Sequence, residues 1–247
     1  MKDKRSQRKH VSVQEWLALA KRSAPSSLLQ AAEICDQAKE LILRGDYYSA
    51  SDAVLPVATH ESFPLSKRAR KIAVMALDEI TDEHYEKGDY QSAIRCLDQW
   101  IALEPEALYP LVRKAEILWL ELDKPDEASQ IYRTLTESHP HCVEAWLGLA
   151  HIALFREQVD SAIVYLKQAW SAIKHPEWVY PPTKEIVTNI MESMYVLTGR
   201  LLAKLGDPLG ALQFLAAGMD NVSDSEYIHE EIEIIERLLS EKPADSE

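Results

Sequence analysis

The sequence repeats a short phrase: GDYYSA at residues 45–50, GDYQSA at 88–93 and GDPLGA at 206–211. Each copy lies between two stretches whose apolar residues recur at helical spacing. A glycine can adopt the left-handed conformation that ends a helix, and the aspartate after it can accept hydrogen bonds from the free amides of the next helix. The phrase therefore predicts a tight turn between two antiparallel helices.

Two weaker copies lie between the second and the third, DKPDEA at 123–128 and EQVDSA at 157–162. All five copies end on alanine, and successive alanines are 43, 35, 34 and 49 residues apart. A small side chain is expected at this position because the two helices of a hairpin approach closely there. One such turn is common by chance, but five with matched flanks indicate a repeat.

The flanking residues resemble the tetratricopeptide repeat, whose pattern is W-x2-L-G-x2-Y, then A-x3-F, then P, with a period of about 34 residues. The fourth copy fits best, with Trp146 and Leu149 in its first helix and Ala162 and Leu166 in its second. The resemblance covers roughly residues 28–220. It implies an all-α fold, a right-handed α-solenoid of about five antiparallel helical hairpins. The expected repeats lie at about 28–64, 67–105, 107–140, 142–176 and 183–219.

Three features depart from the repeat pattern. Thr81 and Thr198 stand at packing positions, and the turn at 122–125 has one residue more than the pattern. A long joint, HPEWVYPPT at 175–183, follows the fourth repeat. The joint interrupts the period, so two packed segments are an alternative to one uniform solenoid.

The composition agrees with a helical protein in a reducing compartment. Of the 247 residues, 47% are apolar and only seven are glycine, which favours a folded, mostly helical chain. Cys35, Cys96 and Cys142 match no metal or redox spacing, so three reduced thiols are expected. No stretch approaches the roughly 18 apolar residues of a membrane span. We therefore expect a soluble, cytoplasmic protein without membrane insertion.

The net charge of -13 is unevenly distributed. Residues 1–22 carry seven Lys or Arg against two Asp or Glu, and the remainder carries 20 against 38. An acidic surface disfavours nucleic acid and anionic lipid and favours a basic partner, although acidity also promotes solubility. No nucleic acid partner is expected.

The N-terminal end is expected to hold a basic, disordered tail at 1–11 and a short helix at 12–24. Ser12 and Glu15 have the spacing of a capping box, and Val13, Trp16 and Ala20 recur on one helical side. The helix either caps the first repeat or offers Trp16 to another protein.

The C-terminal end is expected to hold an acidic capping helix at 223–241 and a frayed tail at 242–247. Ser223 and Glu226 have capping-box spacing. The apolar residues after them are expected to share one side, namely Tyr227, Ile228, Ile232, Ile235, Leu238 and Leu239.

Local signatures of enzyme chemistry do not occur in the sequence, which has no glycine-rich phosphate loop, HExxH, GxSxG or paired CxxC. We therefore expect no catalytic residue, no cofactor and no bound metal. The one cluster of metal-binding residue types is His139, His141 and Cys142, in a turn where polar residues are expected anyway.

The family resemblance implies that positions 2, 5, 9, 12 and 13 of each repeat line a concave groove. Carried over residue by residue, these positions predict an acidic and aromatic partner-binding groove. Such a groove suits a basic or amphipathic segment of a partner protein, with aromatic side chains supplying most of the interface energy. The predicted groove residues are Asp78, Asp82, Tyr85, Glu86, Tyr109, Glu116, Trp119, Leu120, Glu144, Leu147, His151, Phe155 and Arg200.

Three functions remain open from the sequence. The leading one is a non-catalytic scaffold or adaptor that binds a partner segment in the groove. A dedicated chaperone for a secreted or assembling partner is the second, and a metal-dependent regulatory or enzymatic subunit is the third. The co-chaperones that clamp a terminal carboxylate are disfavoured, because Asn189 and Asn221 are the only asparagines and neither lies at a clamp position.

Overall fold

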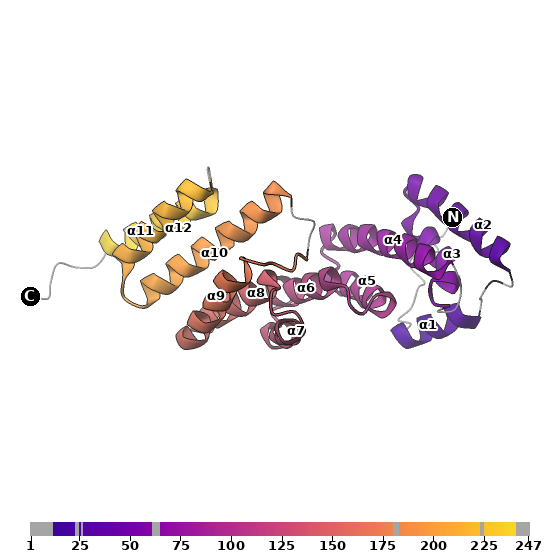
Figure 1. The fold of residues 1–247 in the computed structure, drawn as a ribbon, viewed down its shortest axis with the longest axis horizontal. Coiled ribbons are helices and arrows are strands. Elements are labelled where there is room, and N and C mark those ends of the chain that lie inside the picture. The colour runs from indigo at the N-terminus through magenta and orange to yellow at the C-terminus, as the bar shows by residue number, and fades with distance from the viewer. Residues whose placement is uncertain are drawn as a thin grey trace, which may run out of the picture. The chain divides into compact units, whose positions relative to one another are not determined.

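The computed structural model of the protein describes residues 12–22, 25, 27–60, 65–179, 183–222 and 225–240. The tails expected at 1–11 and 242–247 lie outside these residues. The described residues form helices and no strand, which confirms the all-α fold (Figure 1). The helices are α1 (Val13–Arg22), α2 (Leu28–Leu43), α3 (Tyr47–Ala58), α4 (Ser66–Glu86), α5 (Tyr90–Leu103), α6 (Leu108–Glu116), η2 (Ile117–Glu121), α7 (Pro125–Ser138), α8 (Val143–Phe155), α9 (Val159–Ala172), α10 (Lys184–Lys204), α11 (Pro208–Asn221) and α12 (Glu226–Ser240).

The chain forms two compact units, unit 1 (Met1–Ile117) and unit 2 (Leu118–Glu247). In unit 1, α2 packs on α3 and α4 on α5, and α1 lies against α3 and α5. In unit 2, α8 packs on α9 and α10 on α11, while α12 lies against both α10 and α11. The division falls inside the third expected hairpin and not at the 175–183 joint.

The predicted turns form as the repeated phrase indicates. Gly45, Gly88 and Gly206 have φ angles of 74°, 71° and 86°, in the left-handed region. Each following aspartate caps the next helix, as Asp207 does by accepting a hydrogen bond from the Gly210 amide at 2.8 Å. The five phrase-ending alanines are fully buried, which confirms the close approach of paired helices: Ala50, Ala93, Ala128, Ala162 and Ala211.

The two weaker copies of the phrase keep the same backbone without glycine. Asp123 and Glu157 stand at the glycine position, five residues before the alanine, and have φ angles of 51° and 57°. A side chain in this region is strained by roughly 1–2 kcal/mol. The turn geometry therefore persists where the sequence signal has faded.

The extra residue before the 122–125 turn is absorbed in a π-helical turn. The α6 helix passes at Ile117 into η2, and the Lys124 amide donates to the Leu118 carbonyl at 2.8 Å. A π-turn is the usual way for a helix to hold one additional residue. It rotates the side chains of η2 relative to a regular helix.

Both threonines at packing positions are accommodated by hydrogen bonding. The hydroxyl of Thr81 donates to the Leu77 carbonyl at 2.7 Å, one turn earlier. Thr198 donates likewise to Met194 at 2.7 Å and accepts a bond from the Trp170 indole at 3.1 Å. Neither hydroxyl is therefore left unpaired in the core.

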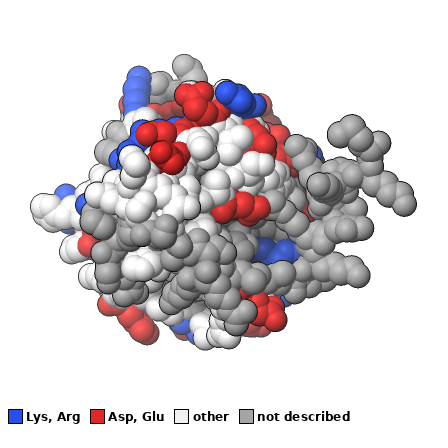
Figure 2. Space-filling model, turned by 90° about the vertical axis from the view of Figure 1, so that its right-hand side faces the viewer, with Lys and Arg blue, Asp and Glu red and all other residues white. Residues whose placement is uncertain are grey.

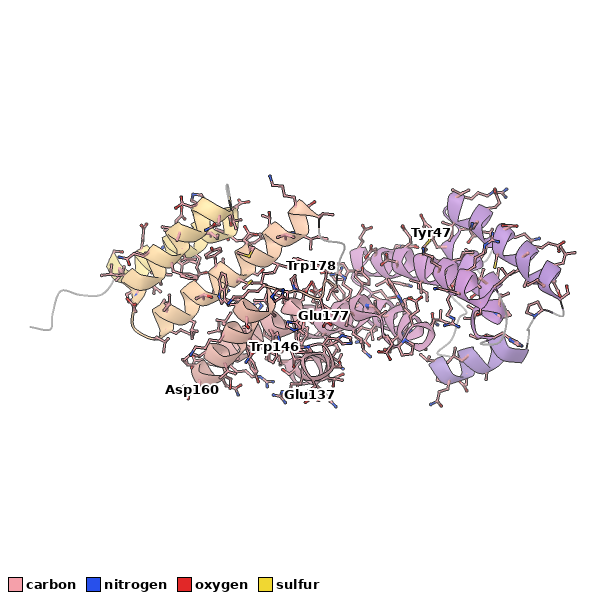
Figure 3. The ribbon with its side chains drawn as sticks, viewed as in Figure 1. Tyr47, Glu137, Trp146, Asp160, Glu177 and Trp178 are labelled. Carbon is pink, nitrogen blue, oxygen red and sulfur yellow. The ribbon has the colours of Figure 1, made fainter. Side chains whose placement is uncertain are left out.

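The joint after α9 folds back on the α7–α8 turn. The Glu177 amide donates to the His141 carbonyl at 3.0 Å, and the Glu177 carboxylate lies 3.5 Å from Nδ1 of His139. Trp178 packs on the cluster of buried residues formed by α8, α9 and α10. Trp146, Glu177 and Trp178 lie in the same part of unit 2 in Figure 3.

The two terminal helices are capped by serine. At α1 the predicted capping box forms, because the Ser12 amide donates to Glu15 at 3.0 Å and the Glu15 amide to Ser12 at 3.2 Å. At α12 the cap is Ser225, which accepts from the Ile228 amide at 3.0 Å. The predicted cap, Ser223, lies outside the described residues. None of the described helices is both long and apolar enough to cross a membrane.

Candidate partner-binding surfaces

In unit 1, the predicted groove residues of α4 and α6 meet around Tyr109. The Tyr109 hydroxyl donates to the Asp78 carboxylate. Burial raises the pKa of Asp78, and burial together with Asp78 raises that of Tyr109. Oδ1 of Asp78 is buried and has no hydrogen-bond partner among the described residues. This oxygen is an acceptor that a cationic or N–H group could satisfy.

A cation also lies in the unit 1 surface. Cζ of Arg113 lies 4.4 Å from the centroid of the Tyr85 ring, and Nη1 of Arg113 lies 3.5 Å from Oε2 of Glu116. Burial raises the pKa of Glu116, with Arg113 opposing this. Asp82 and Glu86 are exposed on the same helix as Tyr85. This surface of unit 1 therefore carries both acidic and basic side chains.

Arg113 is not among the predicted groove residues, and the residue before it, Val112, is fully buried. A shift of one residue on a helix turns a side chain by about 100°. On the face of the molecule drawn in Figure 2, acidic and basic side chains are interspersed around uncharged surface.

In unit 2, Trp119 of η2 contacts His151 and Phe155 of α8, and Leu120 is the next residue of η2. These four predicted residues are called the Trp119 group. The Trp119 ring meets His151 and Phe155 edge to face, with centroid distances of 5.7 and 4.8 Å. Leu120 and Phe155 are 60% and 62% exposed. The indole Nε1 of Trp119 is buried and donates to no described residue.

His151 is held in its neutral form by its surroundings. Burial lowers the pKa of the imidazole, and the positive charge of Arg200 acts in the same direction. A neutral imidazole beside the Trp119 ring makes the Trp119 group less polar.

The remaining predicted residues of unit 2, Glu144, Leu147 and Arg200, make other contacts. Leu147 is only 8% exposed and packs in the core with Leu166 and Met194, so the prediction that it lines a groove is not supported by its burial. Glu144 is half-buried one turn before it and lies 3.9 Å from the Cys142 thiol. Arg200 forms an ion pair with Glu231 of α12 at 2.7 Å.

His139 and Cys142, which the sequence places in one cluster with His141, have different surroundings in the structure. Cys142 is buried, and desolvation raises its thiol pKa to about 12. His139 faces Glu177, as described above. The described residues include no group of three or more His, Cys, Asp or Glu side chains placed to hold a metal ion.

The helix α12 carries residues that the sequence reading placed wrongly. Tyr227 and Leu238 were expected on one side with Ile228 and Ile235. Only the two isoleucines are buried, whereas Tyr227 and Leu238 are exposed together with Ile234. The signal was present in the sequence, because residues 227, 234 and 238 recur at helical spacing in a row of their own.

Comparison with known proteins identifies the repeat in unit 2. Residues 120–172 match the tetratricopeptide repeat family, a range that runs from η2 to the end of α9. No curated protein matches the sequence.

Several solved structures resemble the fold. MamA from Desulfovibrio magneticus RS-1 is 18% identical with a TM-score of 0.49, covering 79% of this chain and 98% of its own. PilW, a type IV pilus biogenesis factor, is 14% identical with a TM-score of 0.41, covering 81% and 97%. A tetratricopeptide repeat protein from Parabacteroides merdae is 15% identical with a TM-score of 0.35, covering 84% and 99%.

Proposed function

From the tetratricopeptide repeat at residues 120–172, we propose that the protein is a non-catalytic scaffold or adaptor that binds a segment of a partner protein. The Trp119 group of unit 2 is the main contact in this proposal. It combines exposed apolar side chains with a buried indole N–H that has no acceptor among the residues that the structure describes. A partner backbone carbonyl would satisfy that donor while an apolar side chain covers Phe155.

The charge of unit 2 favours a basic partner. Residues 118–247 contain 22 Asp or Glu and 10 Lys or Arg, whereas residues 1–117 contain 18 and 17. The net charge is therefore -12 for unit 2 and -1 for unit 1, out of -13 for the whole chain. Long-range attraction would speed the association of a Lys- or Arg-rich segment with unit 2.

A second group in unit 1, Asp78 with Tyr109, supports an additional contact of the same partner class. The unpartnered oxygen of Asp78 suits a partner N–H or a cation. Removal of the Asp78 carboxylate would weaken partner binding less than a change in the Trp119 group, because charged contacts at a surface contribute less than buried aromatic ones.

The experiment is affinity capture with the full chain and two matched variants. In Leu120→Ser/Phe155→Ser the exposed apolar side chains of the Trp119 group are replaced by polar ones. Val164→Ser is the control, because Val164 is 53% exposed on α9, a helix that contributes no residue to the group. A scaffold that uses this surface retains its partner in the control and loses it in the double variant. Equal retention by both variants would contradict the proposal.

A dedicated chaperone is a second candidate, favoured by the exposure of Phe155 and Leu120. A chaperone holds apolar segments of an unfolded client, so its binding is expected to survive high salt. The scaffold with a basic partner is expected to weaken as salt rises, because charge attraction is screened. Repeating the capture over a salt series separates these two functions.

A further inference from the structure

The outward row of α12 consists of Tyr227, Ile234 and Leu238. The three side chains are 67%, 46% and 56% exposed. They stand four residues before, three after and seven after Glu231, so all four residues share one side of the helix. A capping helix whose only task is to cover the last hairpin has no need of this second apolar side.

The α12 helix is held firmly by its other sides. Ile228 and Ile235 are buried in a cluster with Tyr195 and Leu215. Glu231, only 5% exposed, binds the Arg200 guanidinium of α10. One helical turn and a half earlier, the Ser225 hydroxyl donates to Glu192 of α10. These contacts fix the rotation of α12 about its axis. The outward row therefore lies next to the edge of α12 that contacts α10.

The helix that carries the outward row, α12, and the helix that carries His151 and Phe155, α8, both pack against α10. Arg200 binds Glu231, which belongs to the side of α12 that carries the row. The charge of Arg200 also lowers the pKa of His151, a member of the Trp119 group. Arg200 belongs to α10, which packs against both α8 and α12 within unit 2.

We propose that α12 is a second wall of the partner-binding surface and that its outward row takes an amphipathic helix of the partner. The inference rests on the proposed function, since it extends the Trp119 group across Arg200 to α12. The row spans 11 residues, or about 16 Å at a rise of 1.5 Å per residue, which fits about three turns of a partner helix lying alongside. Apolar side chains on one face of that helix pack on Tyr227, Ile234 and Leu238.

The charge around the row selects a basic helix. Glu226, Glu230 and Glu233 are exposed on the solvent side of α12, next to the row. Arg237 is the one basic residue among those of α12 that the structure describes. Lys or Arg residues flanking the apolar face of the partner would lie against these carboxylates.

The test uses the full chain and a defined probe, a fluorescent peptide of about 18 Leu and Lys residues with leucines at i, i+3, i+4 and i+7. One control peptide has the same composition with alternating leucines, and another has Glu in place of Lys. Fluorescence anisotropy gives the affinity of each peptide for the wild type. The amphipathic Leu/Lys peptide is expected to bind, and both control peptides to bind at least about tenfold more weakly.

The variants separate this inference from the proposed function. Ile234→Ser/Leu238→Ser is expected to weaken the Leu/Lys peptide about tenfold, because two apolar anchors are lost, and Val164→Ser to leave it unchanged. Circular dichroism and thermal unfolding check that the exposed substitutions leave the fold intact. If Leu120→Ser/Phe155→Ser weakens binding but Ile234→Ser/Leu238→Ser does not, the inference about α12 is wrong and the scaffold function stands. If neither variant weakens binding, or if the alternating peptide binds equally well, both are contradicted.

Discussion

Trp119 meets Phe155 edge to face in unit 2, with 4.8 Å between the ring centroids and 71° between the ring planes. Trp119 belongs to the π-helical turn η2, and Phe155 is the last residue of α8. Their ring contact depends on the extra residue that η2 absorbs, since the side chains of a regular helix would be rotated there. The departure from the repeat pattern thus builds the apolar group proposed to bind the partner.

The Trp119→Phe substitution tests the unpartnered indole. It removes a buried N–H that has no acceptor, so the free energy of unfolding is expected to stay unchanged or to rise by up to about 1 kcal/mol. The affinity for a captured partner is expected to fall about fivefold, because the donor to the partner is lost. Urea unfolding and a binding titration measure the two effects. Unchanged affinity would show that the indole N–H makes no bond to the partner.

The Glu157→Gly substitution tests strain in the α8–α9 turn. Glu157 has a φ of 57°, which glycine adopts without penalty. The expected gain in unfolding free energy is about 0.5–1 kcal/mol after the extra chain entropy of glycine is subtracted.

Two control variants accompany this measurement. Gly206→Ala places a side chain at a φ of 86° and is expected to cost about 1 kcal/mol. Lys204→Ala removes the cation 3.7 Å from Glu157 and is expected to change stability little, because the pair is exposed. A loss of stability in Glu157→Gly would show that the turn is not strained.

The Gly199→Ala substitution tests a close approach of α10 and α11. A Cβ at this position would stand 2.8 Å from Cγ of Leu215, which is fully buried. Overpacking is expected to lower the unfolding free energy by about 1–3 kcal/mol. In a Leu215→Ala background the added methyl group has room, so Gly199→Ala is expected to cost far less there. An equal cost in both backgrounds would contradict this packing.

The pH dependence of stability tests the environment of His151. Burial lowers the pKa of His151 in the folded state below its ordinary value of 6.5. The unfolded chain therefore binds a proton at higher pH than the folded chain. The contribution of His151 is complete above pH 6.5 and is lost as the pH falls towards the folded-state pKa.

The measurement is urea unfolding of the wild type and His151→Gln at pH 7 and pH 5.5. The comparison with the variant is needed because burial also lowers the pKa of His84, which contributes to the pH dependence of both proteins. The wild type is expected to lose more stability than the variant over this interval. Equal losses would show that His151 is not desolvated.

Much of the fold could be predicted from the sequence because its signals are local. A glycine with an aspartate after it and an alanine five residues on predicts a hairpin turn wherever it occurs, and the turns at Gly45, Gly88 and Gly206 follow it. The turn at Glu157 was also found, through the alanine and the period, although the glycine is missing. Such features depend on neighbouring residues only.

The candidate site could be predicted only in part because it depends on distant contacts. Position within the repeat assigned both Trp119 and Phe155 to the groove, and their rings are in contact. The same rule assigned Leu147 to the groove, yet α10 packs over this part of α8 and buries it. Arg200 was expected to face a partner but binds Glu231, 31 residues later. This ion pair helps to set which side of α12 faces α10, and no local sequence pattern shows the pair.

The central measurement is the dissociation constant of the captured partner for the wild type, Phe155→Ser and Val164→Ser, determined by titration calorimetry at one salt concentration. We expect the Phe155→Ser complex to be at least about tenfold weaker than the wild-type complex, since an exposed aromatic anchor is lost, and the Val164→Ser complex to be unchanged. Equal dissociation constants for all three proteins would contradict partner binding at the Trp119 group.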